Sequence, residues 1–90
     1  MEKGNLVIAT KGKEKNQYFV ILSMENKFAY IVDGKRLKTS NPKKKNLKHI
    51  QKASKNQLSS KVLDDKNERA NYAIRKFIKE EKEKLCQKMM

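Results

Sequence analysis

The sequence predicts a small, mainly β fold, either a barrel or a sandwich, followed by one C-terminal α-helix. In the first half, apolar runs rich in branched and aromatic side chains alternate with short turn sequences. The last third instead carries apolar residues at helical spacing. A chain of 90 residues is expected to form one domain with a thin core.

Three strands are predicted in the first half of the chain. They are Leu6–Ala9, Tyr18–Met24 and Phe28–Val32. The second of them, YFVILSM, is the strongest strand pattern in the sequence. A polar loop over residues 11–16 contains Gly12, and Glu25-Asn26 supplies turn residues before the third strand.

A fourth strand is predicted after a tight turn at Asp33-Gly34. An Asp-Gly pair accepts the positive φ angles of a two-residue hairpin, so Arg36–Thr39 would return beside the third strand. Pro42 lacks the N–H that a sheet ladder requires and is expected to end this strand. A short fifth strand is expected near residues 49–52.

The segment after Pro42 combines a basic run with two apolar residues. We expect Leu47 and Ile50 to anchor it to the core while the lysine and the histidine between them stay outside. Residues 54–63 are mostly polar and are predicted to be a connector.

One amphipathic helix is predicted over residues 64–88. Asp65 followed by Glu68 matches an Asp version of the capping box. An apolar stripe at helical spacing is expected to pack against the β domain. The stripe consists of Ala70, Ala73, Ile74, Phe77 and Ile78. The chain therefore divides into a β domain over 1–53, a connector over 54–63 and this helix.

Positive charge is the strongest functional signal in the sequence. The chain holds 23 Lys and Arg against 10 Asp and Glu, a net charge of +13. Residues 1–63 carry 15 basic and 4 acidic side chains, and the interval from Lys35 to Lys61 carries 10 basic residues and no acidic one. Such a region favours a polyanion, because binding phosphates releases condensed counterions. Nucleic acid is the first candidate partner, ahead of an anionic membrane surface, an acidic protein, or a surface that is Lys-rich only for solubility.

The residue types give little support to chemistry other than binding. Cys86 and His49 are the only cysteine and histidine, so neither a disulfide nor a zinc site is expected. The sequence has no glycine-rich nucleotide loop and no nucleophile–base arrangement, and we expect no enzymatic activity and no cofactor. No apolar run approaches the ~20 residues that span a bilayer. The N-terminal apolar run is too short for a signal peptide, so a soluble cytoplasmic protein without a membrane partner is expected.

A resemblance to a known family rests on three stretches of the chain. They are Gly4–Asn16 ahead of the second predicted strand, Val32–Arg36 (VDGKR) and Asn41–Ile50 (NPKKKNLKHI). With these stretches, about half the chain resembles the KOW-domain RNA-binding proteins, in particular the short bacterial relatives of archaeal and eukaryotic large-subunit ribosomal proteins. Asn16 stands where that family usually has a second glycine, and Glu14 where it usually has an aspartate. Because asparagine tolerates left-handed backbone, we expect the turn to be kept.

The resemblance implies a five-stranded SH3-like barrel whose loops and basic edge meet RNA, in the first place ribosomal RNA of the large subunit. Lysines would hold phosphates as point charges, and successive lysines of an extended segment would point to alternate sides. The candidate RNA-binding residues are Lys11, Gly12, Lys13, Lys15, Lys35, Arg36, Lys38, Lys43, Lys44, Lys45, Asn46, Lys48 and His49. Ribosomal proteins are further candidate partners, and the free protein is expected to be a monomer. No residue is expected to be catalytic or to bind a metal.

Alternative roles stay open for several of these residues. The lysines beside Gly12 either hold phosphates or are solvated at a plain turn. Arg36 either forks onto a phosphate or pairs with Asp33 at the surface. His49 either contacts RNA or has a structural polar role.

Two other functions compete with RNA binding. The β domain and the C-terminal helix would also suit a protein-interaction adaptor of a translation or transcription complex. A binder of double-stranded DNA would need an element that fits a groove, and the sequence shows none clearly. A salt series distinguishes RNA binding from the adaptor function. A complex held by phosphates weakens steeply as salt rises, whereas an apolar interface does not.

Overall fold

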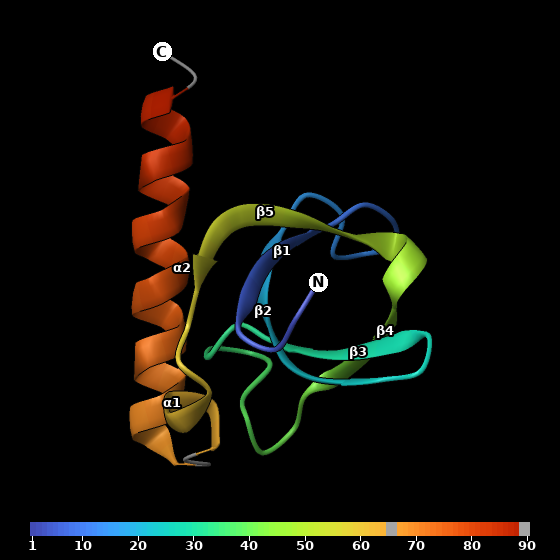
Figure 1. Cartoon of the computed structure of the whole chain (residues 1–90), viewed down its shortest axis with the longest axis horizontal. Helices are drawn as coiled ribbons and strands as arrows, with labels where there is room; N and C mark the ends of the chain where they lie inside the picture. The colour runs from blue at the N-terminus through green and yellow to red at the C-terminus, as the bar shows by residue number, and fades with distance from the viewer. Residues whose placement is uncertain (65–66, 89–90) are drawn as a thin grey trace.

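The structure is a computed structural model that describes residues 1–64 and 67–88. Within these residues the chain forms a five-stranded antiparallel sheet followed by a C-terminal helix (Figure 1), which confirms the predicted mainly β fold class. The strands are β1 (Asn5–Ala9), β2 (Tyr18–Glu25), β3 (Phe28–Val32), β4 (Lys43–Asn46) and β5 (Ile50–Gln57). The helical elements are the 3-10 turn η1 (Leu47–His49), α1 (Ser60–Asp64) and α2 (Glu68–Lys88).

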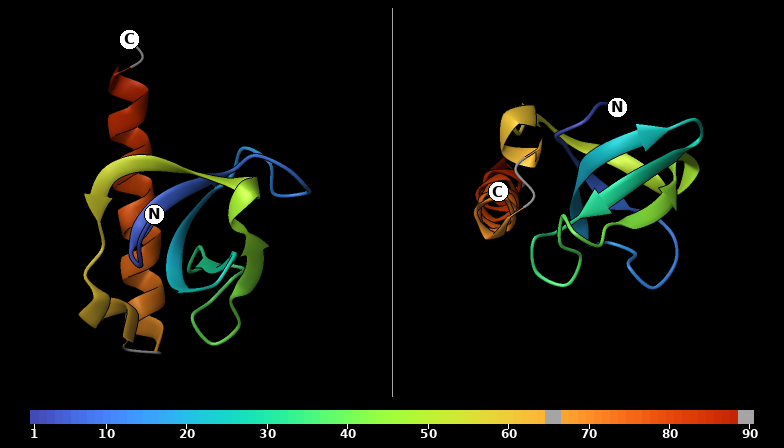
Figure 2. Two further views of the ribbon diagram at one scale, coloured as in Figure 1. Left: turned by 45° about the vertical axis from the view of Figure 1, so that its right-hand side comes forward. Right: turned by 90° about the horizontal axis from the view of Figure 1, so that it is seen from below.

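The strands are ordered β4-β3-β2-β1-β5 in the sheet. The first three agree with the prediction, since β3 has the expected bounds and β1 and β2 are each one residue longer. The two edge strands, β4 and β5, are joined directly by η1, and the sheet curls around its inner face (Figures 1 and 2). Because the described strand pairs contain no ladder between β4 and β5, closure into a barrel stays a prediction.

A bulge in β2 helps to curl the sheet. Ile21 lies opposite Ile31, but Ser23 lies opposite Tyr30, so β2 has one residue more than β3 over this interval. The extra residue is Leu22. A bulge of this kind bends its strand and increases the local twist.

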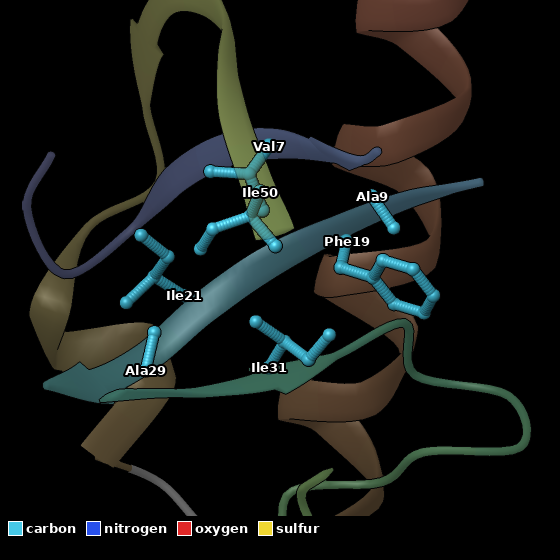
Figure 3. Packing of buried hydrophobic residues seen from close by; sticks show 7 residues of the cluster. All are labelled: Val7, Ala9, Phe19, Ile21, Ala29, Ile31 and Ile50. Atoms are coloured by element: carbon cyan, nitrogen blue, oxygen red, sulfur yellow. The ribbon is translucent and has the colours of Figure 1, made fainter. Parts of the chain in front are cut away.

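The sheet has a hydrophobic core on each face. The inner cluster consists of Val7, Ala9, Phe19, Ile21, Ala29, Ile31 and Ile50, whose side chains converge inside the curl (Figure 3). The outer cluster consists of Leu6, Val20, Leu22, Val32, Leu63 and Ile74. Successive residues of a strand point to opposite faces, so the unbroken apolar run of β2 supplies both cores. Tyr18 and Phe19 accordingly face opposite ways.

The long helix α2 covers the outer face of the sheet. Ile74 is fully buried, and Phe77 and Ile78 pack against the same cluster, which confirms the predicted packing of the apolar stripe. The helix begins at Glu68, where the Asn67 side chain accepts hydrogen bonds from two backbone N–H groups of the first turn. The predicted cap at Asp65 lies outside the described residues. No described helix is long and apolar enough to cross a membrane.

The predicted fourth strand, Arg36–Thr39, is wrong. The Asp33 carboxylate accepts hydrogen bonds from the backbone N–H groups of Lys35 and Leu37, and the Leu37 carbonyl accepts two more from Asp33 and Gly34. The segment therefore satisfies its backbone locally, and a two-residue hairpin does not form.

The strand beside β3 is β4, which begins immediately after Pro42. Proline thus precedes the strand instead of ending it, at a position where its missing N–H removes no ladder bond. The fifth strand is also longer than expected, because β5 continues to Gln57. The predicted connector over 54–63 holds the end of β5 and most of α1 instead, since backbone pairing with β1 extends the strand through polar residues.

The loop after β3, residues 33–42, is fastened to α2. The Thr39 N–H donates to the side-chain oxygen of the buried Asn71 at 3.0 Å, and Arg75 Nη1 donates to the Gly34 carbonyl at 2.7 Å. A Cβ atom at Gly34, where φ is 79°, would lie 2.3 Å from the Asn71 carbonyl oxygen. The close contact between loop and helix therefore depends on a residue without a side chain.

Replacing this glycine tests the docking of the loop. Gly34→Ala is expected to lower the free energy of unfolding by about 3 kcal/mol, the sum of a left-handed backbone and a contact with fixed main-chain atoms. Gly12→Ala is the matched control, because Gly12 has a φ of 89° but its new Cβ would meet only side-chain atoms, the Lys45 ammonium at 3.0 Å and Glu14 Oε2 at 3.6 Å. Its expected loss is about 1 kcal/mol. Equal losses in urea denaturation would contradict the proposed contact.

Candidate nucleic-acid interface

The first candidate segment is the loop between β1 and β2, residues 10–17. Gly12 and Asn16 both have positive φ angles, 89° and 73°, so the asparagine keeps the turn as predicted. The Asn16 N–H also closes the loop by donating to the Ala9 carbonyl at 2.8 Å. The loop exposes Lys11, Gly12, Lys13 and Lys15. Three cations therefore project from one tightly closed turn.

Glu14, in the same loop, ties the loop to β4. Its carboxylate accepts hydrogen bonds from the ammonium groups of Lys43 and Lys45, the latter at 3.3 Å. Lys45 also donates to the Lys11 carbonyl at 3.1 Å. The side chains of Glu14 and Lys45 are only 12% and 10% exposed. Two of the three successive lysines thus contact Glu14, Lys45 as a largely buried side chain and Lys43 with 39% of its side chain exposed.

The register of β4 explains why Lys43 and Lys45 contact Glu14 whereas Lys44 does not. Lys43 lies opposite Ile31 and Lys45 opposite Ala29, two residues of the inner core, so both side chains start on the inner face. Lys44 points to the other side, and its ammonium lies 4.4 Å from the centre of the Phe28 ring. The expected alternation of the lysines is therefore confirmed, and Lys44 is the exposed member of the run.

The second candidate segment is the loop that is docked on α2. It exposes Lys35, Arg36 and Lys38. Arg36 Nη2 lies 3.5 Å from the Gln17 side-chain oxygen, and the pairing with Asp33 is not found among the described ion pairs. Lys38 lies 4.0 Å from the Glu68 carboxylate, a surface distance that leaves its ammonium accessible.

The remaining candidates lie at the turn between β4 and β5. The Asn46 side chain accepts the Lys48 N–H at 2.9 Å and caps η1, so its amide has a structural role. Lys48 is exposed, whereas His49 is half-buried and its carbonyl accepts the Thr10 N–H at 2.8 Å. The expected anchors are confirmed, because Ile50 is buried and Leu47 packs against the inner cluster.

The fold brings the two cationic loops to one side of the molecule. In the right-hand view of Figure 2, the loops after β1 and β3 project in the same direction, and Figure 1 shows them at the upper and lower ends of the sheet. The contact between Arg36 and Gln17 joins them. The exposed cations of the candidate interface are Lys11, Lys13, Lys15, Lys35, Arg36, Lys38, Lys44 and Lys48. A surface of this kind offers several simultaneous contacts to a phosphate backbone.

A groove between α2 and the two loops was not predicted. It has a volume of about 790 Å³. It is lined by Asn16, Gln17, Tyr18, Asp33, Lys35, Arg75, Ile78, Lys79, Lys82 and Glu83. Lys79 and Lys82 were not among the candidates predicted from the sequence, and the docking of the loop on α2 brings them beside Lys35.

A buried carboxylate, Glu81, also escaped sequence reasoning. It is 3% exposed and accepts hydrogen bonds from Ser54 and, at 2.9 Å, from Asn56, both in β5. Lys84 Nζ lies 3.1 Å from its second oxygen. Burial raises the pKa of Glu81, but these hydrogen bonds outweigh burial and leave the pKa below its usual value. Glu81 therefore fastens the second half of α2 to the edge of the sheet.

Acid is expected to weaken the contact between the first loop and β4. Hydrogen bonds from Lys43, and less so from Lys45, lower the pKa of Glu14 from 4.5 to about 2. A carboxylate with a lowered pKa stabilises the fold fully above about pH 4.5 and loses that contribution as pH falls towards about 2. The difference in unfolding free energy between wild type and Glu14→Gln should be about 2 kcal/mol at pH 7 and should shrink below pH 4.5. A difference that is independent of pH would contradict this assignment.

Two lysines contact Glu14 and two nearby lysines are exposed, so the two pairs should contribute differently to stability. Lys43→Ala/Lys45→Ala leaves the partly buried Glu14 carboxylate without its cations and should cost about 2 kcal/mol in urea denaturation. Lys44→Ala/Lys48→Ala removes the same charge from exposed positions and should cost less than about 1 kcal/mol. Equal costs would show that the register of β4 does not divide the lysines.

Comparison with known proteins assigns no function to this surface. No protein-family model matches the sequence, and no curated protein matches it. Among the described residues, no group of three or more His, Cys, Asp or Glu side chains is arranged to hold a metal ion. The function is therefore argued from the charge and geometry of the interface, and the likeness to KOW-domain proteins remains a resemblance of three sequence stretches.

Proposed function

We propose that this protein is a non-enzymatic RNA-binding module that docks on structured RNA, in the first place ribosomal RNA of the large subunit, through contacts between lysines and phosphates. The observation that carries the proposal is the pair of cationic loops on one side of the fold. Each loop exposes three cations, and Lys44 in β4 and Lys48 in η1 are exposed as well.

The carboxylates near this surface are already occupied. Glu14 is held by two lysines, and the Asp33 carboxylate accepts two backbone N–H groups. Neither therefore competes strongly for the exposed cations of its own loop. A polyanion that approaches the two loops meets mainly positive charge, with the exposed Glu68 carboxylate beside Lys38 as an opposing charge, and its binding would release counterions.

The shape of the surface favours RNA over double-stranded DNA. Reading the major groove requires a helix or a two-stranded ribbon that protrudes into it. The long helix α2 instead packs on the sheet through Ile74, Phe77 and Ile78. Loops that carry cations suit the irregular backbone of folded RNA, where shape and phosphates are recognised together.

The adaptor alternative is less well supported. A protein-docking surface is expected to contain a contiguous apolar patch. The large apolar side chains exposed in the described part of the chain are Met1, Met24 and Tyr72, which come from the N-terminus, β2 and α2. Single exposed side chains on separate elements do not make such a patch.

The assignment to the ribosome rests on the resemblance to KOW-domain proteins.

The proposal is tested by co-sedimentation with purified ribosomal subunits through a salt series. The site variant is Lys13→Ala/Lys35→Ala/Lys44→Ala, which removes one exposed cation from each loop and one from β4. The matched control is Lys52→Ala/Lys55→Ala/Lys61→Ala, which removes three exposed cations from β5 and α1. Both variants keep Lys43 and Lys45, so the Glu14 contacts stay intact.

We expect wild type and control to travel with the large subunit and the site variant to leave it at lower salt. The slope of log affinity against log salt should also fall by about one for each phosphate contact that is lost. If the folded wild type stays at the top of the gradient even at low salt, ribosomal binding is excluded. If the two triple variants behave alike, binding follows total charge and not this surface.

A further inference from the structure

The groove between α2 and the two cationic loops has the composition of a nucleotide site, an inference that rests on the proposed RNA binding. Of the candidate RNA-binding residues predicted from the sequence, only Lys35 lines this groove. In the right-hand view of Figure 2 the loop after β3 lies between α2 and the loop after β1. The groove is therefore continuous with the cationic surface and not a separate face of the molecule.

Cations stand on both walls of the groove. Lys35 projects from the loop, while Lys79 and Lys82 are three residues apart on α2 and thus share one helix face. All three side chains are exposed. Arg75 holds the walls together, since its guanidinium donates to the Gly34 carbonyl and lies 3.6 Å from Glu68.

The groove also has an apolar surface. Tyr18 and Ile78 line it, and both are partly buried side chains that pack against the outer core. Lys82 Nζ lies 5.5 Å from the centre of the Tyr18 ring. This is a loose cation–π distance, so the ammonium can turn to a phosphate while the ring stays fixed by the core.

The charge balance of the groove favours an anion. Four cationic residues line it against two acidic ones, Asp33 and Glu83. The Asp33 carboxylate is already engaged by two backbone N–H groups, so Glu83 is the main opposing charge. An occupant should therefore combine a flat apolar part with negative charge.

We propose that this groove takes one unpaired nucleotide of the bound RNA, with its base against Tyr18 and Ile78 and its flanking phosphates at Lys35, Lys79 and Lys82. The volume of about 790 Å³ lies within the range of small-ligand sites, about 300–1,000 Å³. A base exposes its flat face to a side chain only when it is splayed from the helix. Single-stranded or bulged RNA is therefore the class of ligand, and regular duplex is not.

The test compares two RNA probes by fluorescence anisotropy at low salt: labelled hexauridylate and a labelled RNA duplex of twelve base pairs. Lys79→Ala/Lys82→Ala removes the cations of the helix wall. Tyr18→Leu removes the ring but keeps an apolar side chain against the outer core. Lys55→Ala/Lys61→Ala is the control with the same charge change at exposed positions outside the groove. Thermal melts establish that each variant is folded.

Both groove variants should bind hexauridylate about tenfold more weakly than wild type, and the duplex less than about threefold more weakly. The control should change the two affinities equally. Bound hexauridylate should also shift the amide NMR signals of residues 16–18, 35 and 78–83. These shifts place the nucleotide without recourse to any variant.

Three outcomes would overturn the inference, and they differ from one another. If hexauridylate binds but the groove variants match the control and the shifts are confined to the loop tips and β4, the groove is not the site and the proposed function survives. If neither RNA probe binds wild type at low salt, the proposed function fails together with the inference. A loss of equal size for hexauridylate and duplex would show that the groove cations act on any phosphate backbone, which excludes selection of an unpaired nucleotide.

Discussion

The adjacent inner strands β1 and β2 are apolar on both faces, and the rest of the structure depends on covering both faces. The inner face is covered by the curl of the sheet itself, and the outer face needs a separate element. The helix α2 supplies it, with Ile74 at the centre of the contact. Once the helix is fixed there, Asn71 and Arg75 hold the loop after β3 at a defined place. The position of the second cationic loop, residues 33–42, is thus a consequence of the hydrophobic packing of α2 on the outer face of the sheet.

Elements with their own apolar pattern could be predicted from the sequence, and elements stabilised by their partners could not. The first three strands and the helix stripe carry the side chains that they bury. By contrast, β4 is made of three lysines and an asparagine, and its extended form comes from pairing with β3 and from the contacts of Glu14. The false strand at Arg36–Thr39 has the opposite cause. The Asp33 side chain satisfies its backbone locally, which a turn pattern does not reveal.

The candidate site could likewise be predicted only in part from the sequence. The sequence identifies the basic loops correctly as exposed, because lysines around a glycine or after a turn have no apolar neighbours to cover them. It cannot tell that Lys43 and Lys45 are bound by a carboxylate that lies 29 and 31 residues away in the sequence, since only the register of β4 brings them together. The groove was missed for a related reason. Its walls come from the loop after β1, the start of β2, the loop after β3 and α2, and each contributes residues that look ordinary in isolation.

The place of β4 at the edge of the sheet has a consequence for self-association. An open edge offers unpaired backbone groups to any other extended chain, and stacking of edges is a common route to aggregation. Here lysine side chains flank the edge on both faces, and Lys44 keeps its charge towards solvent. A second copy that added to this edge would bring like charges together along the whole strand. The lysines of β4 therefore disfavour the pairing of this edge with a second copy of the chain.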